Sequence, residues 1–97
     1  MLRHIVFFKF KEETPPERRH NFVNMLRKLP KQIPEVVASE VGEDVLHMQR
    51  SFDVAILYTF NDRAALEIYS AHSEHVTLVE ESRRINEKVC SVDYEFK

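Results

Sequence analysis

The chain has 97 residues, of which 43% are hydrophobic, and its formal net charge is −2 with lysine and arginine dispersed along it. Because neutralising phosphates needs clustered cations, this pattern argues against nucleic-acid binding. One cysteine, Cys90, cannot form an intramolecular disulfide, which fits a reducing compartment. No apolar run approaches the roughly 20 residues that span a bilayer, and no signal peptide is recognisable. We therefore expect one cytoplasmic domain over residues 1–97, with no membrane partner.

Four stretches have the apolar alternation of β-strands, over residues 2–10, 36–41, 52–60 and 88–96. The second stretch is more polar, and Gly42, the only glycine, is expected to end it. The first and third carry large apolar side chains on both faces. This pattern predicts central strands that are covered on both sides.

A helix is predicted between the first two strands. Thr14 would cap it by accepting a hydrogen bond from the N–H of Glu17, and proline is tolerated at the first helical position. Pro30 and Pro34 would stop it, since proline disfavours the α conformation in the residue before it. The apolar stripe of this helix consists of Phe22, Val23, Leu26 and Leu29.

Helical segments are also predicted between the last two strands. Asn61 or Asp62 would cap the first of them. Ser73 would interrupt the helix and cap a further one that runs to about Asn86. The residues expected to point inward are Ala65, Leu66, Tyr69, Val76, Val79 and Ile85.

The order β-α-β-β-α-β predicts a ferredoxin-like fold, an α+β arrangement with a four-stranded antiparallel sheet and helices on one face. The other face would then show Ile5, Phe7, Ala55, Leu57, Cys90, Val92 and Tyr94. Leaving several such side chains in water forfeits about 1.5–3 kcal/mol each, comparable in sum to the stability of a domain. We therefore expect a homodimer in which two sheets pack face to face.

Tyr69, His72 and His75 are three residues apart, so on a continuous helix they would form one inclined row. Imidazole titrates near neutral pH and could take a proton from a carbon next to a carbonyl. A tyrosine hydroxyl could then stabilise the enolate oxygen. In the structural alternative, Tyr69 packs on the sheet and His75 bonds a backbone carbonyl.

A cavity between sheet and helices would suit an acyl or aromatic ligand, because its walls would be apolar with few polar groups. The residues expected to line it are His4, Val6, Phe8, Phe22, Leu26, Ile56, Tyr58 and His72. The alternative is that these side chains fill the space. A cavity of about 300 Å³ or more, faced by the polar atoms of Tyr69 and His75, would favour catalysis. A filled space with His75 bonded to backbone would exclude it.

The spacing of His72 and His75 suits two metal ligands on one helical turn, but no third ligand is evident. We therefore expect neither a metal nor another cofactor. Asp53 and Asp93 are expected to bond backbone groups or arginine and lysine side chains at strand ends rather than to act as acids.

Several segments together carry a resemblance to a known family. They are residues 4–11 (HIVFFKFK), Ile33 with Pro34, residues 41–45 (VGEDV), Phe52 with Asp53, Tyr69 with residues 72–75 (HSEH), and residues 92–94 (VDY). Over nearly its whole length the chain resembles the stress-responsive dimeric α/β-barrel (Dabb) proteins. The resemblance implies a ferredoxin-like subunit whose homodimer closes into a barrel.

The resemblance also implies candidate roles for three residues. One plant branch of the family cyclises linear polyketides by aldol condensation, and its histidine and tyrosine fall on His75 and Tyr69. The pocket histidine of its first strand falls on His4. The chain departs from the family at Ser73, where proline is common.

Most of the family has no assigned reaction. The expected function is therefore that of a Dabb protein with a small apolar ligand pocket, and the alternative is a cofactor-free polyketide cyclase or lyase. A haem-degrading monooxygenase on a related barrel is disfavoured, because the tryptophan usual in that family has no counterpart in this chain, which contains no tryptophan.

Overall fold

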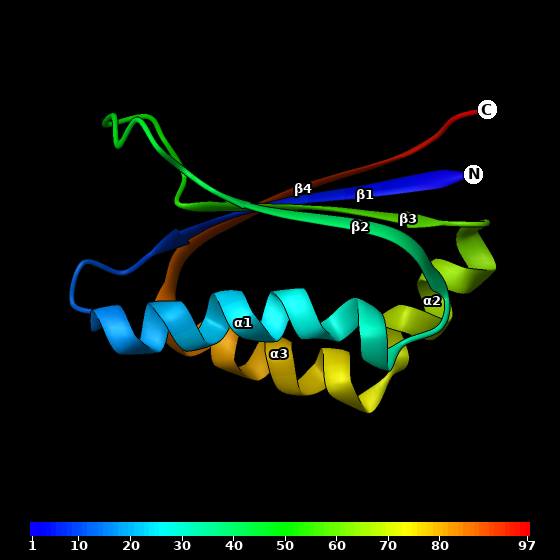
Figure 1. Ribbon diagram of the computed structural model, residues 1–97, viewed down its shortest axis with the longest axis horizontal. Helices are drawn as coiled ribbons and strands as arrows, with labels where there is room; N and C mark the ends of the chain where they lie inside the picture. The colour runs from blue at the N-terminus through cyan, green and yellow to red at the C-terminus, as the bar shows by residue number, and fades with distance from the viewer.

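The computed structural model describes residues 1–97 (Figure 1). Its elements are β1 Leu2–Phe10, α1 Pro16–Gln32, β2 Val36–Glu43, β3 Val54–Phe60, α2 Arg63–Ala71, α3 Ser73–Ile85 and β4 Asn86–Glu95. The strands form one antiparallel sheet in the order β2-β3-β1-β4, and the helices lie on one side of it. The predicted ferredoxin-like topology is confirmed.

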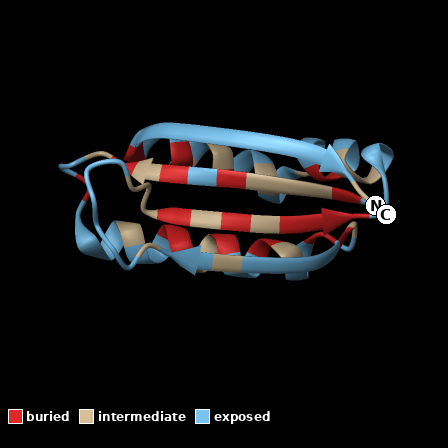
Figure 2. Ribbon diagram, turned by 90° about the horizontal axis from the view of Figure 1, so that it is seen from above, coloured by how far each residue is buried: buried red, intermediate tan, exposed pale blue.

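The central strands β1 and β3 present apolar side chains to both sides of the sheet. Val6 pairs with Ile56 on the face toward the helices, and both are buried. One residue earlier on β1, Ile5 pairs with Leu57 on the opposite face, where both are half-buried. Figure 2 shows this alternation as bands along the two central strands. The two-sided pattern predicted for these strands is therefore present.

No helix covers the second face of the sheet, which we call the open face (Figure 1). The pairing register places on it the seven residues predicted there: Ile5, Phe7, Ala55, Leu57, Cys90, Val92 and Tyr94. Phe7 is 42% exposed and Val92 is 52% exposed. A contiguous apolar surface on a monomer of this size indicates a contact site.

Helix α1 begins at Pro16, where the missing N–H is not needed in the first turn. The predicted cap is wrong, because Pro15 is the N-cap residue and no side chain caps the helix. The Thr14 hydroxyl instead donates to the carbonyl of Ile85, at 2.8 Å. Thr14 is buried there, and its bond ties the turn after β1 to the end of α3.

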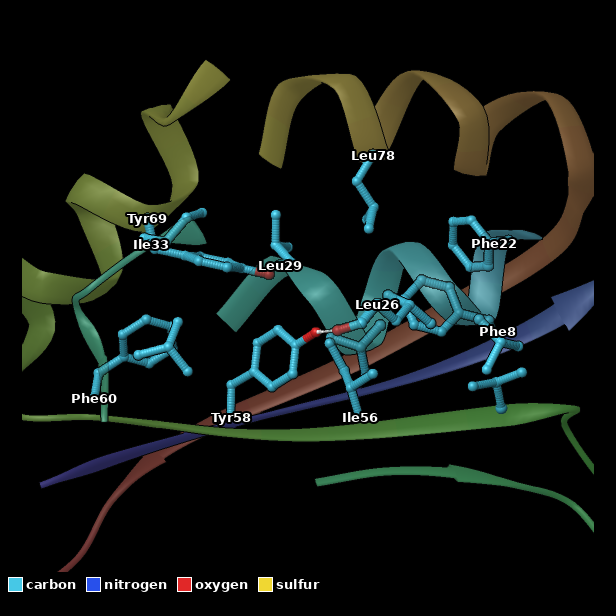
Figure 3. Close-up of a cluster of buried hydrophobic side chains, with 14 of the residues drawn as sticks. Phe8, Phe22, Leu26, Leu29, Ile33, Ile56, Tyr58, Phe60, Tyr69 and Leu78 are labelled. Atoms are coloured by element: carbon cyan, nitrogen blue, oxygen red, sulfur yellow. Dashed lines mark hydrogen bonds between the residues drawn. The ribbon is translucent and has the colours of Figure 1, made fainter. Parts of the chain in front are cut away.

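Helix α1 continues through Pro30, so the prediction that Pro30 ends it is wrong. A proline inside a helix leaves the carbonyl four residues earlier without its usual donor. Here that carbonyl belongs to Leu26, and it accepts a buried hydrogen bond of 2.5 Å from the Tyr58 hydroxyl on β3 (Figure 3). The helix ends at Gln32, and Ile33 is extended because Pro34 follows it.

Asp62 caps α2 as predicted, accepting from the N–H of Ala65 at 2.9 Å. Ser73 does not cap α3. The cap is His72, whose ring Nδ1 accepts from the N–H of Glu74 at 3.1 Å, and Ser73 is the first residue of the helix.

The inward face of α3 also differs from the prediction. Its buried residues are Leu78, Ser82 and Ile85, whereas Val76 is 47% exposed. Leu78 and Ser82 are four residues apart and Ser82 and Ile85 are three apart, so the three lie on one stripe of the helix. Val76, two residues from Leu78, lies on the opposite side of the helix, so its predicted inward position is wrong.

Three strands have bounds that differ slightly from the predicted ones, and β4 runs from Asn86 to Glu95 rather than over residues 88–96. β2 passes through Gly42 to Glu43, and β3 begins at Val54 rather than at Phe52. Asp53 lies just before β3 and makes two hydrogen bonds to β1. Its carboxylate accepts from the N–H of Phe10 at 2.8 Å, and its N–H donates to the carbonyl of Phe8. This confirms the predicted backbone role of Asp53.

Candidate functional site

A cavity of about 320 Å³ lies between the helix-covered face of the sheet and α3. This volume is at the lower end of the range of small-molecule pockets, roughly 300–1,000 Å³. Strands β1, β3 and β4 contribute one wall, and helices α2 and α3 contribute the other. The lining residues are His4, Val6, Phe8, Ile56, Tyr69, His75, Leu78, Val79, Ser82, Arg83, Val89 and Ser91.

A break between two helices brings Tyr69 and His75 together. Tyr69 lies in the last turn of α2 and His75 in the first turn of α3, and His72 between them is extended. The two ring centroids are 4.5 Å apart, with an interplanar angle of 47°. The row expected on a continuous helix is therefore absent, and His72 caps α3 rather than lining the cavity.

His75 is held in one protonation form by its surroundings. Its Nδ1 lies 3.0 Å from the carbonyl of Ser70, and a carbonyl only accepts, so Nδ1 carries the proton. Burial lowers the pKa of His75; the bond to Ser70 opposes that shift, and repulsion from His4 adds to it. The ring is therefore neutral near pH 7, and its Nε2 has a free lone pair that can accept a proton.

Tyr69 is a buried phenol that can donate a hydrogen bond. Its ring packs edge-on against those of Phe60, Tyr58 and His4. Burial raises the pKa of Tyr69 and the negative charge of Asp93 raises it further, so the hydroxyl keeps its proton. The hydroxyl makes no hydrogen bond to another protein group, and Tyr69 lines the cavity.

His4 forms a pair with Asp93. The two residues are direct neighbours across β1 and β4, and His4 Nδ1 donates a hydrogen bond to Asp93 Oδ1. The carboxylate fixes the orientation of the imidazole and leaves its Nε2 available. The expectation that Asp93 bonds backbone or an arginine or lysine side chain is wrong, because its partner is a histidine. The register of β4 against β1 places Asp93 beside His4, and the alternation of side chains along a strand does not specify that register.

These groups can carry out proton transfer without a bound cofactor. His75 can accept a proton at Nε2, and the Tyr69 hydroxyl can donate to an oxygen that becomes negative. His4 lies on the sheet wall of the cavity, with its ring centroid 5.8 Å from that of Tyr69 on the helix wall. A carbonyl compound in the cavity would therefore meet a base and a hydrogen-bond donor.

The structure brings together six of the ten residues predicted for catalysis or ligand binding. His4, Val6, Phe8 and Ile56 line the cavity, as do Tyr69 and His75. Phe22, Leu26 and Tyr58 do not line it, because they are fully buried in the packed core drawn in Figure 3. Their side chains fill the space beside α1.

Sequence reasoning missed the part of the wall that comes from the later turns of α3 and from β4. Leu78 and Ser82 are four residues apart, which is the signal that could have identified this face of α3. Val89 and Ser91 lie one residue to either side of Cys90, so they point to the opposite face from it. Arg83, beside Ser82, carries no such signal.

No group of three or more histidine, cysteine, aspartate or glutamate side chains is placed to share a metal ion. None of the three helices combines the length and apolarity needed to cross a membrane.

Solved structures resemble this chain over almost its whole length. A dimeric ferredoxin-like protein of unknown function from Bacteroides fragilis is 27% identical, with a TM-score of 0.82 over 98% of this chain and 95% of its own. A Dabb family protein from Mesorhizobium loti is 24% identical, with a TM-score of 0.83 over 99% and 96%. A hydroxynitrile lyase from Passiflora edulis is 20% identical, with a TM-score of 0.88 over 99% and 93%. The last two likenesses concern the fold alone.

No curated protein matches the chain. A family model described as the stress responsive A/B barrel domain, Dabb, matches residues 2–96. The match spans every strand and helix of the ferredoxin-like subunit, and the sequence motifs point to the same family. The chain therefore belongs to the Dabb family.

Proposed function

We propose that the protein binds a small, largely apolar molecule in the cavity beside Tyr69 and His75. The observation that supports this function is the open volume of about 320 Å³ beside the buried hydrophobic core. Apolar side chains such as Val6, Leu78 and Val79 form much of the wall. A small number of polar groups, among them His4, Tyr69 and His75, interrupt these apolar walls, a pattern typical of ligand pockets.

Filling the cavity tests this proposal. Val79 lines it and is half-buried, so Val79→Trp should occupy the volume, while Val76→Trp on the exposed side of α3 is the matched control. Acyl and aromatic compounds are screened by thermal shift against the unchanged protein and both variants. We expect hits that Val79→Trp abolishes and Val76→Trp retains. Hits that survive in both variants would show that binding occurs elsewhere.

A second candidate function is cofactor-free aldol or lyase chemistry, and the neutral state of His75 favours it. Nε2 would take the proton from a carbon next to a carbonyl, and Tyr69 would donate to the enolate oxygen. The enolate carbon would then form a bond to a second carbonyl, whose oxygen recovers the proton from His75. One structural neighbour is described as a hydroxynitrile lyase, so this fold is compatible with lyase chemistry.

Hydrogen–deuterium exchange tests the proton-transfer step without knowledge of the substrate. The α-protons of acetophenone are followed by NMR in heavy water. His75→Gln should slow enzyme-dependent exchange by about 10²-fold or more, the usual contribution of a general base. Tyr69→Phe should slow it less, and His72→Gln, which changes a histidine outside the cavity, should leave it unchanged. Equal rates for the unchanged protein and His75→Gln would reject the catalytic proposal and leave ligand binding standing.

We also infer that the protein works as a homodimer through its open face. Phe7, Val92 and Tyr94 stay substantially exposed there, and the segment after β2 rises on the same side with Val45 and Leu46 exposed (Figure 1). Several structural neighbours are described as dimeric.

A role in stress and a cytoplasmic location are proposals that the family's description and the lone Cys90 support.

A further inference from the structure

The wall of the cavity has one permanent charge, and that charge is positive. Arg83 lines the cavity, and no aspartate or glutamate does. Arg83 makes no ion pair, whereas its neighbour Arg84 lies 4.0 Å from Glu81, which also binds Arg18. In a protein whose net charge is negative, this unpaired guanidinium makes one end of the cavity favourable for an anion.

Ser82 adds a hydrogen-bond donor next to Arg83. It lines the cavity and is 8% exposed. Its hydroxyl oxygen accepts from Asn86 Nδ2 at 2.8 Å, and its own proton has no acceptor within the protein. The hydroxyl is therefore free to donate to an oxygen in the cavity.

Both groups lie in the last turns of α3, where the helix dipole by itself would repel an anion. Two carbonyls at this end already have partners in the protein. The Ile85 carbonyl accepts from the Lys11 N–H and the Thr14 hydroxyl, and the Ser82 carbonyl accepts from the Asn86 N–H. Their partial negative charge is offset by these bonds, so the positive charge of Arg83 can dominate.

We propose that the cavity holds a medium-chain carboxylate, with its anionic group on Arg83 and Ser82 and its apolar chain directed toward Tyr69 and His75. His75 and Arg83 are eight residues apart on α3, a rise of about 12 Å along the helix axis. Leu78, Val79 and Val89 line the stretch between them. This arrangement rests on the proposed ligand-binding function, and it names the class of ligand and the residue that selects it.

Calorimetric titration with decanoate and with methyl decanoate tests this assignment, since the two probes share a chain and differ in charge. We expect the unchanged protein to prefer decanoate, and Arg83→Gln to weaken decanoate binding about five-fold while methyl decanoate is unaffected. Ser82→Ala should weaken decanoate binding as well. Arg84→Gln removes the neighbouring charge outside the cavity and should change neither affinity. Added salt should weaken decanoate binding selectively.

Three outcomes would overturn the proposal. Equal affinity for the two probes, both lost in Val79→Trp, would reject the anion site and leave the proposed ligand-binding function intact. Equal losses in Arg83→Gln and Arg84→Gln would show only a general effect of charge. If neither probe binds the unchanged protein, the ligand class fails, and the broader compound screen then decides the binding function separately.

Discussion

The hydrogen bond from Tyr58 to the Leu26 carbonyl explains how α1 tolerates a proline. Both groups are buried, and Pro30 has no N–H to offer that carbonyl. Tyr58→Phe should lower the free energy of unfolding by about 1–3 kcal/mol, because it leaves a buried acceptor without a partner. Urea unfolding measures the change, and Tyr94→Phe on the open face is the control.

A double-mutant cycle isolates this bond from the other effects of each change. Pro30→Ala restores an N–H that can donate to Leu26 within the helix. In that background Tyr58→Phe should cost at least about 0.5 kcal/mol less than it does alone. Additive effects would show that Tyr58 does not replace the donor that the proline lacks.

The neutral state of His75 predicts how stability changes with pH. Burial lowers the pKa of His75 in the folded protein below the value near 6.5 of an unfolded chain. Between these two values the unfolded chain binds more protons, so stability is retained above about pH 6.5 and falls as pH decreases toward the folded pKa. Unfolding from about pH 7 to pH 5 should show a shallower loss for His75→Gln. An identical slope in both proteins would contradict a buried neutral His75.

The residues of the site were only partly predictable. The chemistry of a tyrosine and a histidine suggested proton transfer by Tyr69 and His75, and the family resemblance pointed to the same pair. The pairing of His4 with Asp93 depends on the register of β1 against β4. A strand's alternation shows which face a side chain occupies but does not show which residue lies opposite it.

At the scale of elements, the junction of α2 and α3 is suited to proline. Ser73 is the first residue of α3, where proline is favoured, and His72 before it has φ −66° and ψ 139°, a conformation that a following proline requires. Ser73→Pro should raise the free energy of unfolding by about 0.4–1 kcal/mol, by reducing the freedom of the unfolded chain. Thermal and urea unfolding measure the gain.

The control is Ser73→Ala, which removes the same hydroxyl but keeps the backbone N–H and the freedom of the chain. It should give no comparable gain. A loss of stability in Ser73→Pro would mean that the helix start differs from the one described.

Elements were predicted well where one periodicity dominates and less well where a distant residue decides. Residues 2–10 carry large apolar side chains on both faces of an extended chain, and β1 has those bounds. A proline usually ends or kinks a helix, but Pro30 lies inside α1, where Tyr58 on β3 donates the hydrogen bond that the Leu26 carbonyl would otherwise lack. The prediction that Thr14 caps α1 was wrong for a similar reason. The Thr14 hydroxyl donates instead to the carbonyl of Ile85, 71 residues away in the sequence.

At the scale of the whole molecule, the sheet has two apolar faces and helices on only one of them. Covering the open face would bury Phe7, Leu57, Val92 and their neighbours, each worth about 1.5–3 kcal/mol when fully buried. This argument was available from the sequence, because the alternation in β1 and β3 and the number of helices were both visible there.

The dimer can be tested with two matched valines. Val92 is 52% exposed on the open face and Val76 is 47% exposed on α3. We expect the unchanged protein to sediment as a dimer at micromolar concentration and Val92→Lys to sediment as a monomer, because a charge buried between two sheets without a partner is costly. Val76→Lys should remain dimeric. The thermal midpoint of the unchanged protein should also rise with concentration, since association stabilises the folded state. A monomeric unchanged protein would leave the apolar side chains of the open face in water, and both the inferred dimer and the barrel formed by two sheets would have to be abandoned.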